Sequence, residues 1–302
     1  MSNINMVIEE KAVSIGPFMV GRLLPFKQKR AVGPFVFIDH MGPIPINEHE
    51  KLDVEPHPHI GLSTLTYLFE GAMMHRDSIG SITEITPGAV NWMNAGKGVV
   101  HSERMPDHIR ETNPGMIMHG LQIWVALPLE LQEMDPDFIH IPASDIPEWE
   151  ENDIKIKLIA GEAFGKKSSV PVHSPLYFLE IKNTTSETKT MDIGNSLFGE
   201  SGLYILEGFV KAEGNMYSPK NILIAQNSKL CHFDIGPNTT VFIFGGEPFP
   251  EERFLMWNFV STDKERLEQA KTDWINQNYD AFPLIPKDDK EFVPFPHYFQ
   301  NK

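Results

Sequence analysis

The sequence predicts an all-β protein made of two barrels in tandem, with a short helix near the C-terminus. Its 22 glycines and 24 prolines are spread along most of the 302 residues and punctuate short apolar runs, which is typical of β-sandwiches and barrels. A five-residue motif, YLFEG at 67–71, returns as YILEG at 204–208. A chain of this length accommodates two domains.

The alternation of apolar and polar residues predicts where the strands lie. In residues 64–69, Leu65, Tyr67 and Phe69 fall on one face, and residues 121–127 alternate in the same way, as expected of strands with one buried face. Further strands are predicted in the second half of the chain, at 154–159, 176–181, 203–206, 221–225 and 240–244.

The repeat indicates a duplicated barrel. PGAV at 87–90 is loosely echoed by PKNI at 219–222, in the same order relative to the first motif. The connection at 135–150 is rich in Pro, Asp and Glu and suits a boundary. We therefore expect a metal-binding barrel in 1–138 and a second barrel in 139–302, which includes the helix and the tail.

A helix is predicted at about 262–276. Thr262 and Glu265 have the spacing of a capping box. Leu267, Ala270 and Trp274 share one helical face that could pack on a sheet. The Pro-rich segment 282–296 is expected to be an irregular tail on the surface.

Composition excludes several classes of function. The net charge of −15 opposes direct binding to a nucleic-acid backbone, and no apolar stretch approaches the ~20 residues that span a bilayer. The N-terminus lacks a basic region followed by an apolar core, so we expect a cytoplasmic protein. The single cysteine, Cys231, excludes an intramolecular disulfide and a cysteine-built metal site, and we expect it to be a buried apolar residue.

Two short motifs carry potential metal ligands. His57 and His59 are two residues apart, as are His101 and Glu103, and alternate side chains of a strand leave the same face. If the two strands are neighbours, three imidazoles and one carboxylate converge. This donor set suits Fe, Mn, Cu, Ni, Co or Zn and leaves positions for water or substrate.

The sequence around these motifs supports a site. NAGKG at 94–98 looks like a tight turn that leads into the strand of His101. The alternative is that these are surface or core histidines without a metal, which an isolated His-x-His pair would favour. His75 and Asp77 could support the ligands from behind, line the cavity or form a hydrogen-bonded turn.

These segments closely resemble the pirin family of the cupin superfamily. The resemblance is carried by HPHIG at 57–61, TLTY at 64–67, HRDS at 75–78, WMNAGKG at 92–98 and HSE at 101–103. It implies two cupin barrels, each a double-stranded β-helix or jelly roll, of which only the first keeps its metal. The family's ligands match His57, His59, His101 and Glu103.

Two positions depart from general cupin patterns in the way that pirins do. Thr64 stands where cupins usually carry a Glu a few residues after the histidine pair, which shifts the carboxylate role to Glu103. Aligning the repeat puts Gly194 and Ser196 at the positions of His57 and His59. The second barrel is therefore expected to bind no metal.

The resemblance implies an enzyme: a metal-dependent dioxygenase that opens flavonols such as quercetin with O₂. One divalent transition metal, expected to be Fe²⁺, would bind the substrate hydroxyl, and Glu103 would be the general base. The alternative is a non-enzymatic, iron-dependent redox-sensing regulator that binds a partner protein. A purely structural β-protein without an ion is a third interpretation.

Overall fold

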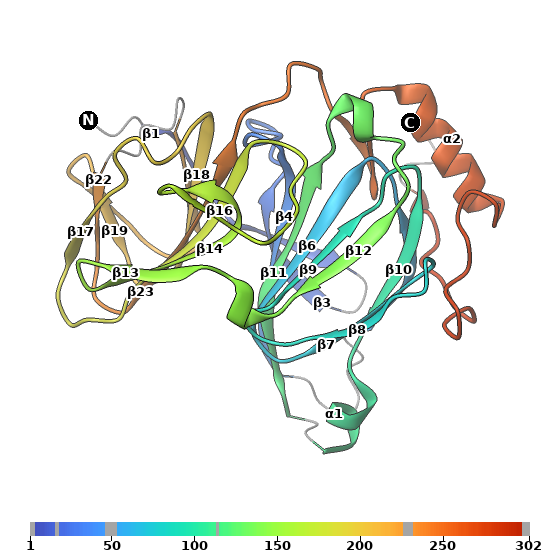
Figure 1. Cartoon of the computed structure of the whole chain (residues 1–302), viewed down its shortest axis with the longest axis horizontal. Helices are drawn as coiled ribbons and strands as arrows, with labels where there is room; N and C mark the ends of the chain where they lie inside the picture. The colour runs from blue at the N-terminus through green and yellow to red at the C-terminus, as the bar shows by residue number, and fades with distance from the viewer. Residues whose placement is uncertain (1–3, 16–17, 46–52, 113–114, 226–231, 298–302) are drawn as a thin grey trace. The chain divides into compact units, whose positions relative to one another are not determined.

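The computed structural model describes residues 4–15, 18–45, 53–112, 115–225 and 232–297, most of which lie in β-strands (Figure 1). The chain forms two compact units. The first-barrel unit contains Val13–Val20, Asp39–His140 and Pro250–Lys302, and the second-barrel unit contains Met1–Ala12, Gly21–Ile38 and Ile141–Phe249. Cys231 lies outside the described residues.

The first barrel is built from one large and one small sheet. The large sheet has the order β12-β9-β6-β11-β4-β3-β2, and the small sheet has the order β5-β10-β7-β8. Their strands are β2 (Lys11–Ile15), β3 (Phe18–Leu24), β4 (Phe35–Pro45), β5 (Val54–His59), β6 (Leu62–Glu70), β7 (Met73–Asp77), β8 (Ile82–Ile85), β9 (Val90–Asn94), β10 (Val99–Arg104), β11 (Ile117–Ala126) and β12 (Asp137–Ile141).

The second barrel repeats this plan. Its large sheet runs β1-β21-β18-β23-β16-β14-β13 and its small sheet runs β17-β22-β19-β20. Their strands are β1 (Ile4–Glu9), β13 (Glu148–Glu151), β14 (Ile154–Ala163), β16 (Leu176–Asn183), β17 (Lys189–Asp192), β18 (Glu200–Glu207), β19 (Val210–Ala212), β20 (Asn215–Tyr217), β21 (Asn221–Ala225), β22 (His232–Ile235) and β23 (Thr239–Gly246). Position for position, β9-β6-β11-β4 corresponds to β21-β18-β23-β16.

The two repeated sequence motifs also share their backbone conformation. β6 ends at Glu70 and is followed by Gly71 at φ +89°, and β18 ends at Glu207 and is followed by Gly208 at φ +74°. The second echo places Lys220 at φ +67° before β21, where Gly88 stands at φ +82° before β9. Glycine adopts positive φ readily, whereas a residue with a Cβ such as Lys220 rarely does, so the recurrence of this backbone conformation supports the prediction of a duplicated barrel.

The remaining elements are short. They are the helices α1 (Asp107–Thr112) and α2 (Lys264–Ile275), the 3-10 turns Leu129–Leu131 and Ala143–Asp145, the strand β15 (Lys166–Lys167), which pairs with β14, and the hairpin β24 (Phe254–Met256) and β25 (Phe259–Ser261). No helix in the described ranges is long and apolar enough to cross a bilayer.

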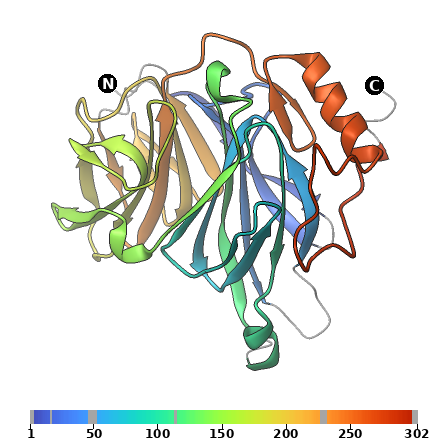
Figure 2. The ribbon, with the colours of Figure 1, turned by 45° about the vertical axis from the view of Figure 1, so that its right-hand side comes forward.

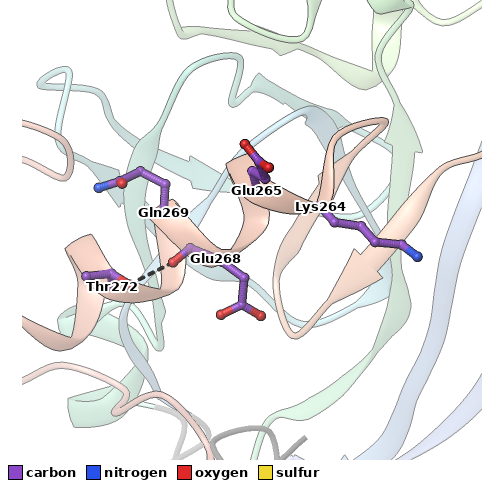
Figure 3. A pocket seen from close by; sticks show the side chains of 5 residues that line it. All are labelled: Lys264, Glu265, Glu268, Gln269 and Thr272. Carbon is purple, nitrogen blue, oxygen red and sulfur yellow. Dashed lines mark hydrogen bonds between the residues drawn. The ribbon is translucent and has the colours of Figure 1, made fainter.

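Helix α2 begins at Lys264, two residues after the predicted start. Its N-cap is Asp263, whose side chain accepts a hydrogen bond from the Glu265 amide, so the predicted capping box on Thr262 is wrong. The predicted apolar face is confirmed, since Leu267, Ala270 and Trp274 are its buried residues. The opposite face is polar and carries Lys264, Glu265, Glu268, Gln269 and Thr272 (Figure 3).

The helix and the tail pack with the first barrel, which differs from the expected assignment to 139–302. Figure 2 shows the orange hairpin and helix, and the red tail, beside strands of the first barrel. Trp274, Phe282, Ile285 and Phe295 form one buried cluster that also includes Ile60, Val100, Phe259, Leu267 and Ala270. The tail is therefore not merely laid over the surface, because its aromatic and aliphatic residues complete an apolar core.

This packing predicts that the apolar face of α2 stabilises the first barrel. Leu267→Ala is expected to lower the free energy of unfolding by about 2–5 kcal/mol, because it leaves a cavity in the cluster. The matched control Gln269→Ala, on the exposed face of the same helix, should change it by less than ~0.5 kcal/mol. Urea unfolding measures both, and equal effects would contradict the packing.

Candidate metal centre

Three buried histidines meet inside the first barrel. His57 and His59 lie on β5 and His101 lies on β10, and the two strands pair antiparallel with His57 opposite His101. One ligand nitrogen from each ring lies within 4.8 Å of the others. Their exposed fractions are 7, 1 and 1%. The predicted convergence of the two motifs is confirmed for the three imidazoles.

Local sequence explains why the rings converge. β5 is the terminal strand of the small sheet, as expected of a strand in which Pro58 has no N–H for a ladder bond. The predicted turn before β10 is also confirmed, because the Gly98 amide donates to the Ala95 carbonyl over 2.9 Å and Gly96 has φ +49°. The turn returns the chain beside β5, so that His101 reaches His57.

Backbone carbonyls fix the orientation of the two β5 imidazoles. The Nδ1 atom of His57 lies 2.8 Å from the Glu55 carbonyl oxygen, and Nδ1 of His59 lies 3.2 Å from the carbonyl oxygen of Asn258. A carbonyl only accepts, so each Nδ1 carries the proton and donates it. Each Nε2 is left with a lone pair, which is the form that binds a metal.

A second hydrogen-bonded chain orients His101. Nε2 of His75 lies 2.9 Å from Oδ2 of Asp77, and Nδ1 of His75 lies 3.4 Å from Nδ1 of His101. The Asp77 carboxylate accepts a hydrogen bond from His75 Nε2, and in that tautomer the Nδ1 atom of His75 carries a lone pair that accepts from Nδ1 of His101. His101 therefore also presents a lone pair at Nε2.

Asp77 combines two of the roles that the sequence left open. Its Oδ2 holds His75, while its Oδ1 accepts hydrogen bonds from the amides of Ile79 (3.1 Å) and Ser81 (2.8 Å). The same carboxylate thus closes the turn after β7 and supports a ligand from behind.

The resulting nitrogen geometry fits a metal ion. Nε2 of His59 and Nε2 of His101 face each other across 3.1 Å, and the hydrogen bonds assign a lone pair to both. Two lone pairs repel at this distance unless a cation lies between them. Metal–nitrogen bonds of about 2.0–2.1 Å separate adjacent ligand nitrogens by about 2.8–3.4 Å in octahedral or tetrahedral sites, and the observed spacing falls in this range.

Burial keeps the three imidazoles neutral. Desolvation lowers the pKa of His57 to about 4, against the opposing effect of its hydrogen bond to Glu55. Desolvation, reinforced by the charge of the neighbouring histidines, also holds the pKa values of His59 and His101 well below the ordinary value. Because only neutral imidazole binds a metal, the site is ready for an ion at neutral pH.

Glu103 lies inside the same barrel but outside the group of three ligand nitrogens. Its side chain is buried, and Oε1 lies 3.5 Å from Oγ1 of Thr66 on β6. Burial raises the pKa of its carboxyl to about 7, although the Thr66 hydrogen bond opposes this. Its role as a fourth ligand therefore stays a prediction.

Sequence reasoning missed the groups that border the ligands. Asn258 lies 199 residues from His59 in the sequence. It contributes a backbone carbonyl, which no pattern of side chains predicts. Trp124 packs edge-on against His59 at 5.1 Å between ring centroids, and Phe138 stacks on His75 at 4.3 Å. Trp124 lies in a predicted strand, where aromatic core residues are common, and Phe138 lies in the connection predicted as the domain boundary, so neither carried a local signal.

Apolar side chains meet across the two strands β17 and β22 of the second barrel. β17 pairs with β22 so that Met191 lies opposite Phe233, and both belong to a continuous apolar core. Gly194 and Ser196, expected at the ligand positions, lie beyond the end of β17, which is Asp192. The alignment of the repeat is therefore offset here, because the segment between β17 and β18 is a turn rather than a strand.

Two barrels of matching strand order, one of which holds a buried three-histidine metal site, define a two-domain cupin. Family comparisons agree: the pirin family matches residues 18–125, and the pirin C-terminal cupin domain matches residues 184–280. The chain is also 44% identical over 296 residues to a pirin-like protein of Caulobacter vibrioides, covering 97% of this chain and 99% of that protein. This chain belongs to the pirin family.

Solved structures extend the comparison. The structure of a quercetin 2,3-dioxygenase from Acinetobacter baumannii is 33% identical with a TM-score of 0.88, covering 96% of this chain and 94% of that one. A bacterial pirin from Escherichia coli, solved in complex with nickel(II), is 18% identical with a TM-score of 0.58, covering 81% of this chain and all of that one. The latter shares the fold.

The geometry predicts that each imidazole is required for metal binding. His101→Ala is expected to weaken binding of a divalent transition metal by more than about 100-fold, since loss of an outer partner of a ligand alone costs 10–100-fold. Exposed His108 provides the matched control His108→Ala, which should bind like the unaltered protein. Metal competition titrations and elemental analysis measure both, and unchanged binding by His101→Ala would contradict the site.

Proposed function

We propose that this chain is a metal-dependent dioxygenase that opens flavonols such as quercetin with O₂. The observation that carries the proposal is a buried carboxyl, Glu103, on the same strand face as His101 and two residues from it. The named activity of the Acinetobacter baumannii relative supports the substrate class. Fe²⁺ is the proposed ion, and Mn, Ni, Co, Cu and Zn also suit these donors.

The residues of the chain divide the chemistry between them. His57, His59 and His101 would hold the ion, and Glu103 would be the fourth ligand in the resting site. When bound, the metal supplies a Lewis acid for the substrate oxygen and a redox centre for O₂. The imidazole orientation is set beforehand by Glu55, Asn258 and the Asp77–His75 pair, so little reorganisation is needed.

Glu103 would take up the proton of the flavonol hydroxyl. A carboxylate in a buried site is a stronger base than one in water, because burial disfavours its charge, and the raised pKa of Glu103 is caused first by burial. Oγ1 of Thr66 donates to Oε1 of Gln122 over 2.9 Å and lies 3.5 Å from Oε1 of Glu103. Trp124 and Phe138 give the surroundings of the histidines an apolar character that suits an aromatic substrate.

The test follows loss of flavonol absorbance when metal-loaded protein meets quercetin under O₂. Glu103→Gln is expected to lower kcat/KM by about 10²–10⁴-fold, the usual contribution of a general base. Exposed Glu111 provides the matched control, because Glu111→Gln should leave turnover unchanged. Elemental analysis of each variant separates loss of the base from loss of the ion.

Absence of turnover with Fe, Mn, Ni, Co and Cu bound at the site would contradict the proposal. Should the same iron-loaded protein then retain a partner protein in only one of the Fe(II) and Fe(III) states, the regulatory alternative would replace it.

A further inference from the structure

The ladder between the two ligand strands is incomplete. β5 contains Pro56 and Pro58, neither of which has an N–H to donate. The register between β5 and β10 shifts between His101, which lies opposite His57, and Glu103, which lies opposite Val54. The pairing of β10 is therefore irregular on its β5 side where its two functional side chains enter the barrel, while β7 pairs with residues 101–104 in regular register on the other side.

The carboxylate of Asp288, in the C-terminal tail, binds the face of β10 that points away from the metal site. Ser102 and Arg104 alternate with His101 and Glu103 along the strand, so they leave its opposite face. Oδ2 of Asp288 accepts hydrogen bonds from Ser102 Oγ and Arg104 Nε, both over 2.7 Å, and Oδ1 accepts from Arg104 Nη2 over 2.6 Å. The bidentate contact with Arg104 fixes the orientation of the guanidinium relative to the carboxylate as well as the distance between them.

Arg104 also connects this contact to the start of β5. Nη1 of Arg104 lies 3.8 Å from Oδ2 of Asp53, the residue directly before β5. Asp53 Oδ1 also accepts from the Met105 amide and from Arg110 Nη2, each over 2.9 Å. A single ionic cluster thus joins the tail, the end of β10 and the beginning of β5.

The same tail covers the outer edge of β5. The Val293 amide donates to the Pro56 carbonyl over 2.9 Å, and the Val293 carbonyl accepts from Trp274 Nε1 of α2 over 2.9 Å. Together with the Asn258 carbonyl on His59, these contacts show that both ligand strands are braced by residues 250–295 and not by the barrel alone.

We propose that Asp288 is a positioning residue for the metal centre, acting through Ser102 and Arg104 to fix how β10 presents His101 and Glu103. The inference rests on the three-histidine site and, for Glu103, on the proposed function. It predicts that the metal's surroundings change when the tail carboxylate loses its charge, although Asp288 touches no ligand.

The experiment compares Asp288→Asn with Asp289→Asn, since Asp289 is the exposed neighbour in the same tail. Co²⁺ is the probe, because its visible absorption reports ligand geometry. Asp288→Asn is expected to weaken Co²⁺ binding by about 10–100-fold, as other supports of ligands do, and to alter the spectrum of the saturated protein. Asp289→Asn should match the unaltered protein in both.

Hydrogen exchange of the metal-free proteins gives a second readout. The amides of Val99–Arg104 should exchange faster in Asp288→Asn, because β10 has lost its outer support, while those of the second barrel should not change. Ser102→Ala removes one of the three hydrogen bonds and keeps the ion pair, so it should fold and give a smaller change of the same kind.

Unaltered Co²⁺ affinity and spectrum in folded Asp288→Asn and Ser102→Ala would overturn the inference. None of these readouts involves quercetin, so an inactive protein that still shows the Co²⁺ changes would refute the dioxygenase and leave the positioning role intact. An altered spectrum with Asp289→Asn as well would also count against a specific role of Asp288.

Discussion

Two imidazole nitrogens that each carry a lone pair face one another across 3.1 Å inside the first barrel. Burial makes protonation of either ring costly, because a charged imidazole in an apolar interior has lost its hydration. A cation between the nitrogens removes the repulsion without placing a proton on either ring. The orientation of His57, the Asp77–His75 pair and the position of Asn258 all serve this arrangement.

The two barrels show how one fold can be kept while its interior changes. Strand order is the same in both, and even the positive φ before β9 recurs at Lys220 before β21. The first barrel has three buried imidazoles between β5 and β10, whereas Met191 and Phe233, which pair across β17 and β22, belong to the apolar core of the second barrel. An apolar core stabilises the second barrel, and the three-histidine group found among the described residues lies in the first.

Much of the centre could be predicted because its ligands follow local rules. Spacing of two puts His57 and His59 on one face of a strand, and the turn at 94–98 brings His101 beside them. The support of the ligands could not be predicted in this way. Asn258 acts through a carbonyl, and Asp288 lies in a Pro-rich tail 184 residues from Arg104, so only the folded chain brings them to the site.

The assignment of the C-terminal segment shows the same limit of local reasoning. The pattern of Leu267, Ala270 and Trp274 identified a helix and its buried face, but periodicity does not say which sheet the face meets. Tertiary packing decides it: Ile60 and Val100, which flank the ligand positions in the sequence, belong to the cluster that receives the helix. The segment thereby becomes part of the structure around the metal.

Anomalous X-ray diffraction from crystals loaded with Co²⁺ or Ni²⁺ tests the central claim most directly. The account predicts one strong peak in the first barrel at about 2.0–2.2 Å from Nε2 of His57, His59 and His101, with a Glu103 carboxylate oxygen as the fourth protein ligand. A peak bound through Nδ1 atoms, or an ion held only at surface histidines with the three Nε2 atoms still facing each other, would contradict it.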